Sequence, residues 1–156
     1  MEQYLQPFID VTKSTFKNFI GADLKVGNPY FMNKNAASEW DISGVIGLSG
    51  EARGAVVIGM KNDLAIQLTC MLTGSKQNSI NEEVMDAIGE IVNIISGNAK
   101  KGLEDIFKLI ISLPIIINGP DHRIEWPHRQ SRIICVPFIV FNSESLLLSV
   151  AIESRK

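Results

Sequence analysis

The run from Asn81 to Ile106 is the longest stretch of this chain that can be laid on one helix. At about 100° per residue, its apolar side chains gather on one wide face that must pack against a core. That face comprises Val84, Ile88, Ile91, Ile95, Ala99 and Ile106, with Met85, Val92 and Leu103 at its margins. The opposite face comprises Glu83, Asp86, Glu90, Asn93, Gly97, Lys100 and Glu104. The rest of the chain must therefore supply a surface that this helix covers.

Stretches with a two-residue period flank this helix on both sides, as is typical of strands. Three of them precede it, at 24–32, 41–50 and 51–61, and the tight connection Ser49-Gly50-Glu51 predicts a hairpin of the last two. Three more runs, rich in Ile, Val and Leu, follow it at 108–119, 132–142 and 145–153. Pro114 and Pro137 lie within these runs and indicate edge strands or bulges, because proline cannot donate a sheet hydrogen bond.

Two further amphipathic helices are expected, at 4–20 and 62–73. The first ends at Gly21, and its apolar face comprises Leu5, Phe8, Ile9, Thr12, Phe16, Phe19 and Ile20. The second is expected to be capped by Asn62 or Asp63 and to end at Gly74, with a buried face of Leu64, Leu68, Met71 and Leu72. Ser79 with Glu82 predicts a capping box at the start of the central helix.

These elements predict an α+β fold in a single domain spanning residues 1–156. A mostly antiparallel sheet of about six strands would be covered on one face by the helices at 62–73 and 81–106, with the helix at 4–20 added to them. A chain of 156 residues can bury a sizeable core without disulfides. Cys70 and Cys135 are two lone thiols and fit a reducing cytosol.

Charge and hydropathy exclude several functional classes. The net charge is −2 and no basic block is present, which argues against nucleic-acid binding. No apolar run reaches the ~18 residues of a membrane span, and the N-terminal residues lack the basic region of a signal peptide. We therefore expect a cytoplasmic protein without a membrane span.

Few residues outside the central helix could carry chemistry. The chain has no Gly-rich phosphate loop and no GxSxG nucleophile motif. His122 and His128 lie near Asp121 and Glu125 and could hold a metal weakly. Histidines in loops are mostly solvated, so no metal site is expected.

Glu90 and Asn93 are three residues apart and are therefore neighbours on the exposed face of the central helix. Asparagine is a poor helix-interior residue because its amide competes for backbone hydrogen bonds. An exposed carboxamide on a rigid helix can both accept from and donate to one water molecule. The pair is either an ordinary part of a solvated surface or a device that holds a water in line with an electrophile.

A spaced set of residues on and after this helix resembles a family signature: Asp86, Glu90, Asn93, Gly97, Asn98 and, further on, Pro114. The pattern Asp-x-x-x-Glu-x-x-Asn followed by Gly-Asn looks like that of the CheC/CheX/FliY chemotaxis phosphatases. The single motif, the chain length and the order of elements are most like CheX. Family members with two active helices repeat the motif, and this chain does not, so one site per chain is expected.

The resemblance implies a phosphatase that removes the phosphoryl group from the aspartyl phosphate of a CheY-type response regulator and so terminates chemotaxis signalling. Asn93 would orient the attacking water, and Glu90 would pair with the active-site lysine of the receiver domain. Asp86, Gly97 and Lys100 would contact the partner, with Gly97 giving clearance. The chain would have no cofactor of its own, because the receiver supplies the Mg²⁺. CheX-type proteins also dimerise by continuing one sheet across two subunits, so a homodimer is expected.

One alternative is a non-catalytic adaptor or flagellar-switch-type module that binds a receiver domain through the same fold. The presence of both Glu90 and Asn93 favours the enzyme, because a binding module has no need to keep the two together.

Overall fold

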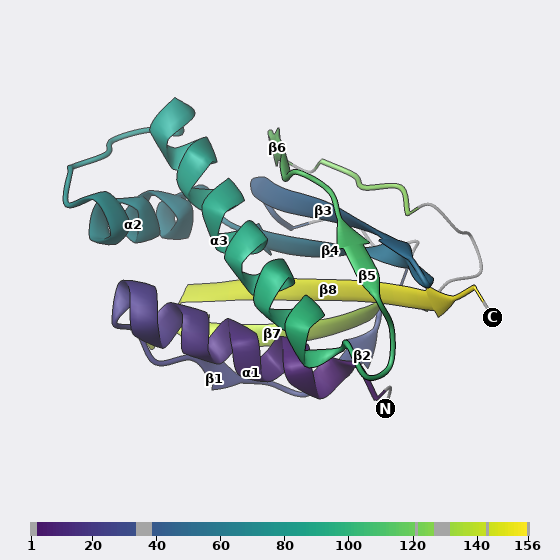
Figure 1. Cartoon of the computed structure of the whole chain (residues 1–156). Coiled ribbons are helices and arrows are strands. Elements are labelled where there is room, and N and C mark those ends of the chain that lie inside the picture. Colours follow the sequence, from purple (N-terminus) through teal and green to yellow (C-terminus); the bar gives the residue numbers. More distant parts are fainter. Residues whose placement is uncertain (1–2, 34–38, 121, 127–131, 143, 156) are drawn as a thin grey trace.

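A single antiparallel sheet forms the base of the molecule, and the helices lie across it (Figure 1). The computed structural model describes residues 3–33, 39–120, 122–126, 132–142 and 144–155. Its long strands are β3 (Ile42–Gly50), β4 (Ala52–Met60), β7 (Ile134–Val140) and β8 (Glu144–Ser154). Strand β3 pairs with β4, β4 with β8, and β8 with β7, each antiparallel. The expected antiparallel sheet and the hairpin of β3 and β4 are therefore confirmed.

Both edges of the sheet are built from short strands. Strands β1 (Lys25–Val26) and β2 (Tyr30–Phe31) pair with β7, and strands β5 (Leu109–Ile111) and β6 (Ile115–Asn118) pair with β3. Within the described residues, the sheet thus has eight strands rather than about six. The runs expected as single strands at 24–32 and 108–119 are each interrupted by a short segment that contains a proline, at Pro29 and at Pro114.

Pro137 lies in β7, which is not an edge strand, because β1 and β2 cover its outer side. The Pro137 carbonyl accepts a 2.8 Å hydrogen bond from the Gly27 amide. In an antiparallel ladder the N–H and C=O of one residue point the same way, so the missing N–H faces the break between β1 and β2. The proline is tolerated because the neighbouring strand leaves the ladder where a donor would have been needed.

The helices are α1 (Leu5–Thr15), which continues into a π-helical turn at Phe16–Ile20, then α2 (Asn62–Thr73) and α3 (Glu82–Gly102). Helix α3 contacts β3 to β6, α1 packs alongside α3, and α2 packs against α3 and the π-helical turn (Figure 1). Phe8 and Phe16 are fully buried in the same core as the sheet. The N-terminal helix is therefore part of the covering layer.

Helix α3 approaches the sheet closely over Gly44 of β3. A Cβ at Gly44 would lie 3.0 Å from Cγ1 of Val92 and 3.4 Å from Cγ2 of Ile88. Val92, Ile88, Ile91 and Ile95 are at most 2% exposed. This tight packing against the strands fixes the position of α3 relative to the sheet.

The helix caps differ from the expected ones. Helix α3 is capped by Asn81, whose side-chain oxygen accepts a 2.9 Å hydrogen bond from the amide of Val84. The expected capping box with Ser79 is wrong. Neither Asn62 nor Asp63 caps α2; instead Asp41, from the loop before β3, accepts a 3.0 Å hydrogen bond from the amide of Asn62.

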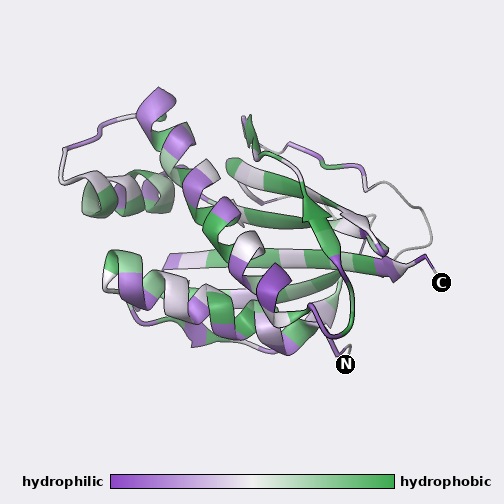
Figure 2. Cartoon of the chain, in the orientation of Figure 1, coloured by the Kyte–Doolittle hydropathy of each residue, from purple (hydrophilic) through white to green (hydrophobic). Residues whose placement is uncertain are grey.

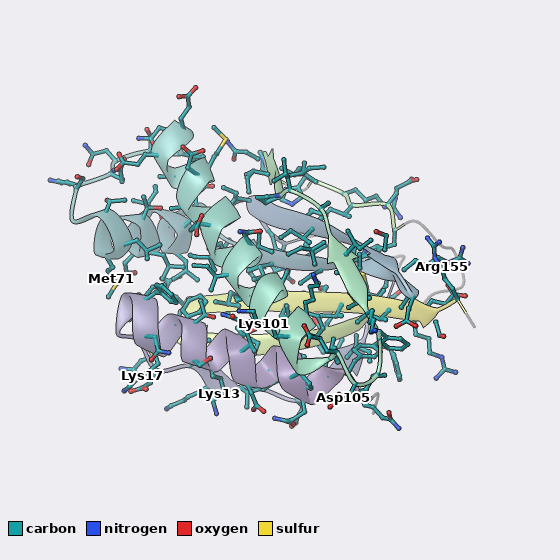
Figure 3. The ribbon with its side chains drawn as sticks, viewed as in Figure 1. Lys13, Lys17, Met71, Lys101, Asp105 and Arg155 are labelled. Atoms are coloured by element: carbon teal, nitrogen blue, oxygen red, sulfur yellow. The ribbon has the colours of Figure 1, made fainter. Side chains whose placement is uncertain are left out.

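Three apolar side chains that the helical periodicity assigned to buried faces are exposed: Phe19 at 56%, Met71 at 44% and Ile106 at 40%. Helix α3 ends at Gly102, so Ile106 lies in a following turn and no longer shares the face of Ile95. Phe19 lies in the π-helical turn, where the i→i+5 spacing rotates side chains away from the α-helical face. Met71 lies on α2 (Figure 3), which packs beside α3.

Candidate functional site

The polar face of α3 points away from the sheet. Figure 2 shows hydrophilic residues at several turns of this helix, in front of strands that are mostly hydrophobic. Glu90 and Asp86 are exposed, and Asn93 is half-buried. Neither Glu90 nor Asn93 has a hydrogen-bond or ion-pair partner within the described part of the chain. The carboxylate and the carboxamide therefore stand one helical turn apart and are available to another molecule.

Asn93 lies in one row along α3 with two glycines, Gly89 four residues before it and Gly97 four residues after it. A Cβ at Gly89 would lie 3.6 Å from Cγ of Pro114, which is ordinary contact. A Cβ at Gly97 would meet only Cδ1 of Ile111, at 4.0 Å. Packing within the chain therefore does not require glycine at position 97, although glycine in a helix interior costs about 1 kcal/mol relative to alanine.

Charge changes sign along this face. Asp86 and Glu90 lie in the N-terminal half of α3, and Lys100 and Lys101 lie in its last turn. Figure 3 labels Lys101. At the two ends of the helix, Glu82 and Glu83 in the first turn and the two lysines in the last turn complement the helix dipole. Lys100 is half-buried and lines a shallow depression with Glu104, Lys108 and Leu109. The five site residues expected from the sequence thus share one helix face, with Lys100 at its far end.

The other candidate residues lie elsewhere. His122 is half-buried, and both ring nitrogens have partners: Nδ1 lies 2.8 Å from the Gly119 carbonyl and Nε2 lies 2.6 Å from the Ser43 hydroxyl. The expectation of a solvated histidine is wrong for this residue. His128 and Asp121 lie outside the described residues. Within the described ranges, no three His, Cys, Asp or Glu side chains are grouped as metal ligands would be.

Two residues of the sheet have shifted pKa values. Burial raises the pKa of the Cys135 thiol, which lies 3.4 Å from the hydroxyl of Ser149. Burial also raises the pKa of Tyr30, and the nearby Cys135 and Glu39 add to the effect. Cys135 lies on β7 and Tyr30 on its neighbour β2, away from α3.

Among the helices in the described ranges, none is long and apolar enough to cross a membrane.

The fold and the exposed Glu-x-x-Asn face of α3 define a protein of the CheC-like class. Residues 42–138 match the model of the family described as chemotaxis phosphatase CheX. That is more than half of the chain, and the chain belongs to this family, as the resemblance implied.

Individual relatives agree with this assignment. The chain is 25% identical over 142 residues to CheY-P phosphatase CheX of Thermotoga maritima, covering 90% of this chain and 89% of that protein. The structure of chemotaxis protein CheX from Vibrio vulnificus superimposes with a TM-score of 0.87 at 28% identity, covering 97% of this chain and 100% of that one. CheX in the CheX–CheY–BeF3–Mg²⁺ complex from Borrelia burgdorferi shares the fold, with a TM-score of 0.84 at 23% identity and coverage of 97% and 99%.

Proposed function

We propose that this protein dephosphorylates the aspartyl phosphate of a CheY-type response regulator and thereby terminates chemotaxis signalling. The observation that carries the proposal is the pair Glu90 and Asn93, one turn apart on the exposed face of α3 and without partners in the described chain. Membership of the CheX family supports it, as does the activity in the name of the Thermotoga maritima relative.

The reaction needs no nucleophile from this protein. A water molecule attacks the phosphorus atom, and the bond between phosphorus and the aspartyl oxygen breaks. The products are inorganic phosphate and the free aspartate carboxylate of the receiver. Asn93 holds that water in line, because its carboxamide can accept from and donate to it. Neutralisation of the phosphoryl charge is assigned to the receiver's own Mg²⁺, as the Mg²⁺ of the Borrelia burgdorferi complex suggests.

Glu90 acts as the second element by pairing with the active-site lysine of the receiver, which sets where α3 enters. The buried face of α3 supports this role, since Ile91 and Ile95 hold the helix against the sheet at 2% and 0% exposure. Catalysis of this kind depends on positioning. Asp86, Gly97 and Lys100 contact the partner on either side of the pair, and Gly97 leaves room for the receiver backbone.

The deciding experiment follows a radiolabelled phospho-receiver incubated with Mg²⁺ and this protein. The proposal expects loss of label that is faster than the receiver's own hydrolysis and slow again with Asn93→Ala. Binding of the receiver without accelerated loss of label would replace the enzyme with a non-catalytic adaptor. No effect and no binding would remove both functions.

We also propose a cytoplasmic homodimer formed by continuation of the sheet across two subunits. The two free cysteines fit a reducing compartment. Both sheet edges carry exposed apolar side chains, with Tyr30 and Phe31 at one edge and Ile110 and Ile115 at the other. Open edges of this kind invite pairing. Sedimentation at micromolar concentration that shows only a 17.2 kDa species would contradict the dimer.

A further inference from the structure

The connection between β5 and β6 presents the most exposed large apolar side chain in the described ranges, Leu113, at 85% exposure. A single exposed leucine on a surface is ordinary in itself. Its meaning depends on whether the backbone holds it in a fixed place and on what lies beside it.

Hydrogen bonds to β3 fix the backbone on one side of Leu113. The amide of Gly47 donates to Oγ of Ser112 at 2.8 Å, and the amide of Ser112 donates to the carbonyl of Gly47 at 2.9 Å. The Ser112 hydroxyl in turn donates to the carbonyl of Leu113 at 2.9 Å. One serine therefore joins the connection to the central hairpin by both its backbone and its side chain.

Pro114 fixes the other side of Leu113. Its ring locks the backbone angle φ and packs against α3 at Gly89, 3.6 Å from the position of a Cβ there. Leu113 is thus held between two anchored residues while its side chain projects into solvent. A side chain held in this way loses little additional freedom when a partner covers it.

The connection runs beside the helix turns that carry Asn93. Ile111 lies near Gly97 and Pro114 lies near Gly89, so the two segments run in opposite directions. Eight helical residues from Gly89 to Gly97 span about 12 Å, and three extended residues from Ile111 to Pro114 span about 10 Å. The lengths match, which places Leu113 alongside the turn between Gly89 and Asn93.

We propose that Leu113 is an apolar anchor for the phosphorylated receiver domain, inserted into an apolar recess beside the receiver's phosphorylation site. This inference rests on the proposed function and adds a specificity residue to it. The receiver is the occupant because the connection lies beside the helix turns that carry Glu90 and Asn93, between the contacts of Ile111 with Gly97 and of Pro114 with Gly89, so a domain docked on that pair also reaches Leu113. An anchor fixed relative to α3 sets the depth at which Asn93 enters.

The test compares Leu113→Ser with Met71→Ser, a matched loss of an exposed apolar side chain on α2. Receiver affinity is titrated with a beryllofluoride-loaded receiver at low and high salt, and kcat and KM are measured with the phosphorylated receiver. Burial of a leucine predicts that Leu113→Ser weakens binding and raises KM about 10- to 100-fold, with kcat nearly kept. The loss should be the same at both salt concentrations, because no charge is removed. Met71→Ser should bind normally, and Leu113→Met should restore most of the affinity.

Unchanged affinity and KM for Leu113→Ser would overturn the anchor while wild-type activity leaves the proposed function standing. A fall in kcat with KM kept would also overturn it, because the leucine would then act on the reacting geometry. If sedimentation shows that Leu113→Ser dissociates a dimer, the occupant is a second copy of this chain and not the receiver. Absence of wild-type dephosphorylation would count against the proposed function, and the affinity titration would still decide the anchor.

Discussion

The hydroxyl of Ser43 lies 2.6 Å from Nε2 of His122, on the face of the sheet opposite to α3. Ser43 is 1% exposed and alternates with Gly44, which faces the helix. The carbonyl of Gly119 can only accept, so Nδ1 of His122 carries the proton of that 2.8 Å bond. The Ser43 hydroxyl, which can both donate and accept, is the partner of Nε2. The histidine thereby joins the segment after β6 to the middle of β3.

Removal of the imidazole should therefore cost stability and leave catalysis intact. His122→Ala leaves the buried hydroxyl of Ser43 without its partner, which costs about 1–3 kcal/mol of unfolding free energy. Denaturant unfolding measures that loss, and Ser43→Ala in the same background should recover part of it. Phospho-receiver turnover should remain at the wild-type level, because the pair lies across the sheet from α3. A large loss of turnover in a folded His122→Ala variant would assign this face a part in the reaction.

A second prediction concerns the start of α3. Asn81→Ala removes the side chain that accepts from the Val84 amide and should cost about 1 kcal/mol of stability. The same side chain donates to Oε1 of Gln77 at 2.8 Å, so the loop before the helix loses a contact too. Ser79→Ala is the matched control and should leave the unfolding midpoint within error. Equal losses for the two variants would restore the capping box that the sequence suggested.

Most of the fold could be predicted from the periodicity of apolar residues, because a buried face places an apolar residue at regular intervals along a helix or a strand. The long helix, the hairpin and the antiparallel sheet follow from it, as does the exposure of Glu90. Breaks within an element are less visible: Gly102 ends α3 before Ile106, and Pro114 divides one apolar run into β5 and β6. The sequence alone does not distinguish Asn81 from Ser79 as the N-cap of α3, because both residue types cap helices.

The roles of Glu90 and Asn93 came from the resemblance, since spacing alone is equally compatible with a solvated surface. The contacts around the site could not be predicted from the sequence. Ser112 meets Gly47 across 65 positions of the chain, and no local pattern signals such a contact. In the sequence, Leu113 is one more residue of a run predicted to be a single apolar strand. Its side chain is exposed because that run is divided into β5 and β6, and Leu113 lies in the connection between them.

Substitution of Gly97 should change the stability of the fold and the affinity for the receiver in opposite directions. A methyl group there would meet only Ile111 at 4.0 Å, so Gly97→Ala should stabilise the helix by up to about 1 kcal/mol. If the glycine gives the receiver clearance, the same variant should bind the receiver more weakly. Gly89→Ala is the control, because its methyl would contact the chain's own Pro114. Melting curves and a receiver titration decide the matter, and tight binding by Gly97→Ala would refute the clearance role.

Glu90→Ala should weaken receiver binding in a salt-dependent way. The carboxylate is exposed and has no partner in the described chain, so under the proposed role its ion pair with the receiver's lysine would form only with the complex. Salt screens such a contact, and the difference between wild type and Glu90→Ala should therefore shrink in high salt. Titration with the beryllofluoride-loaded receiver at two ionic strengths measures it. A difference that stays constant with salt would show that Glu90 does not act through charge.

Asn93→Ala should instead lower kcat while receiver binding is nearly kept. Under the proposed role the carboxamide acts on the attacking water, and that contact matters chiefly as the phosphorus–oxygen bond breaks. If water positioning is what fails, kcat falls by roughly 10²-fold. Asn93→Asp keeps the size of the side chain but places a negative charge against the phosphoryl oxygens, so it should turn over no faster than Asn93→Ala. Steady-state dephosphorylation and a binding titration on folded variants separate the two effects. If Asn93→Ala dephosphorylates the receiver as fast as the wild type does, the water-positioning role is wrong. If the unmutated protein binds the receiver but does not dephosphorylate it, the adaptor function is favoured.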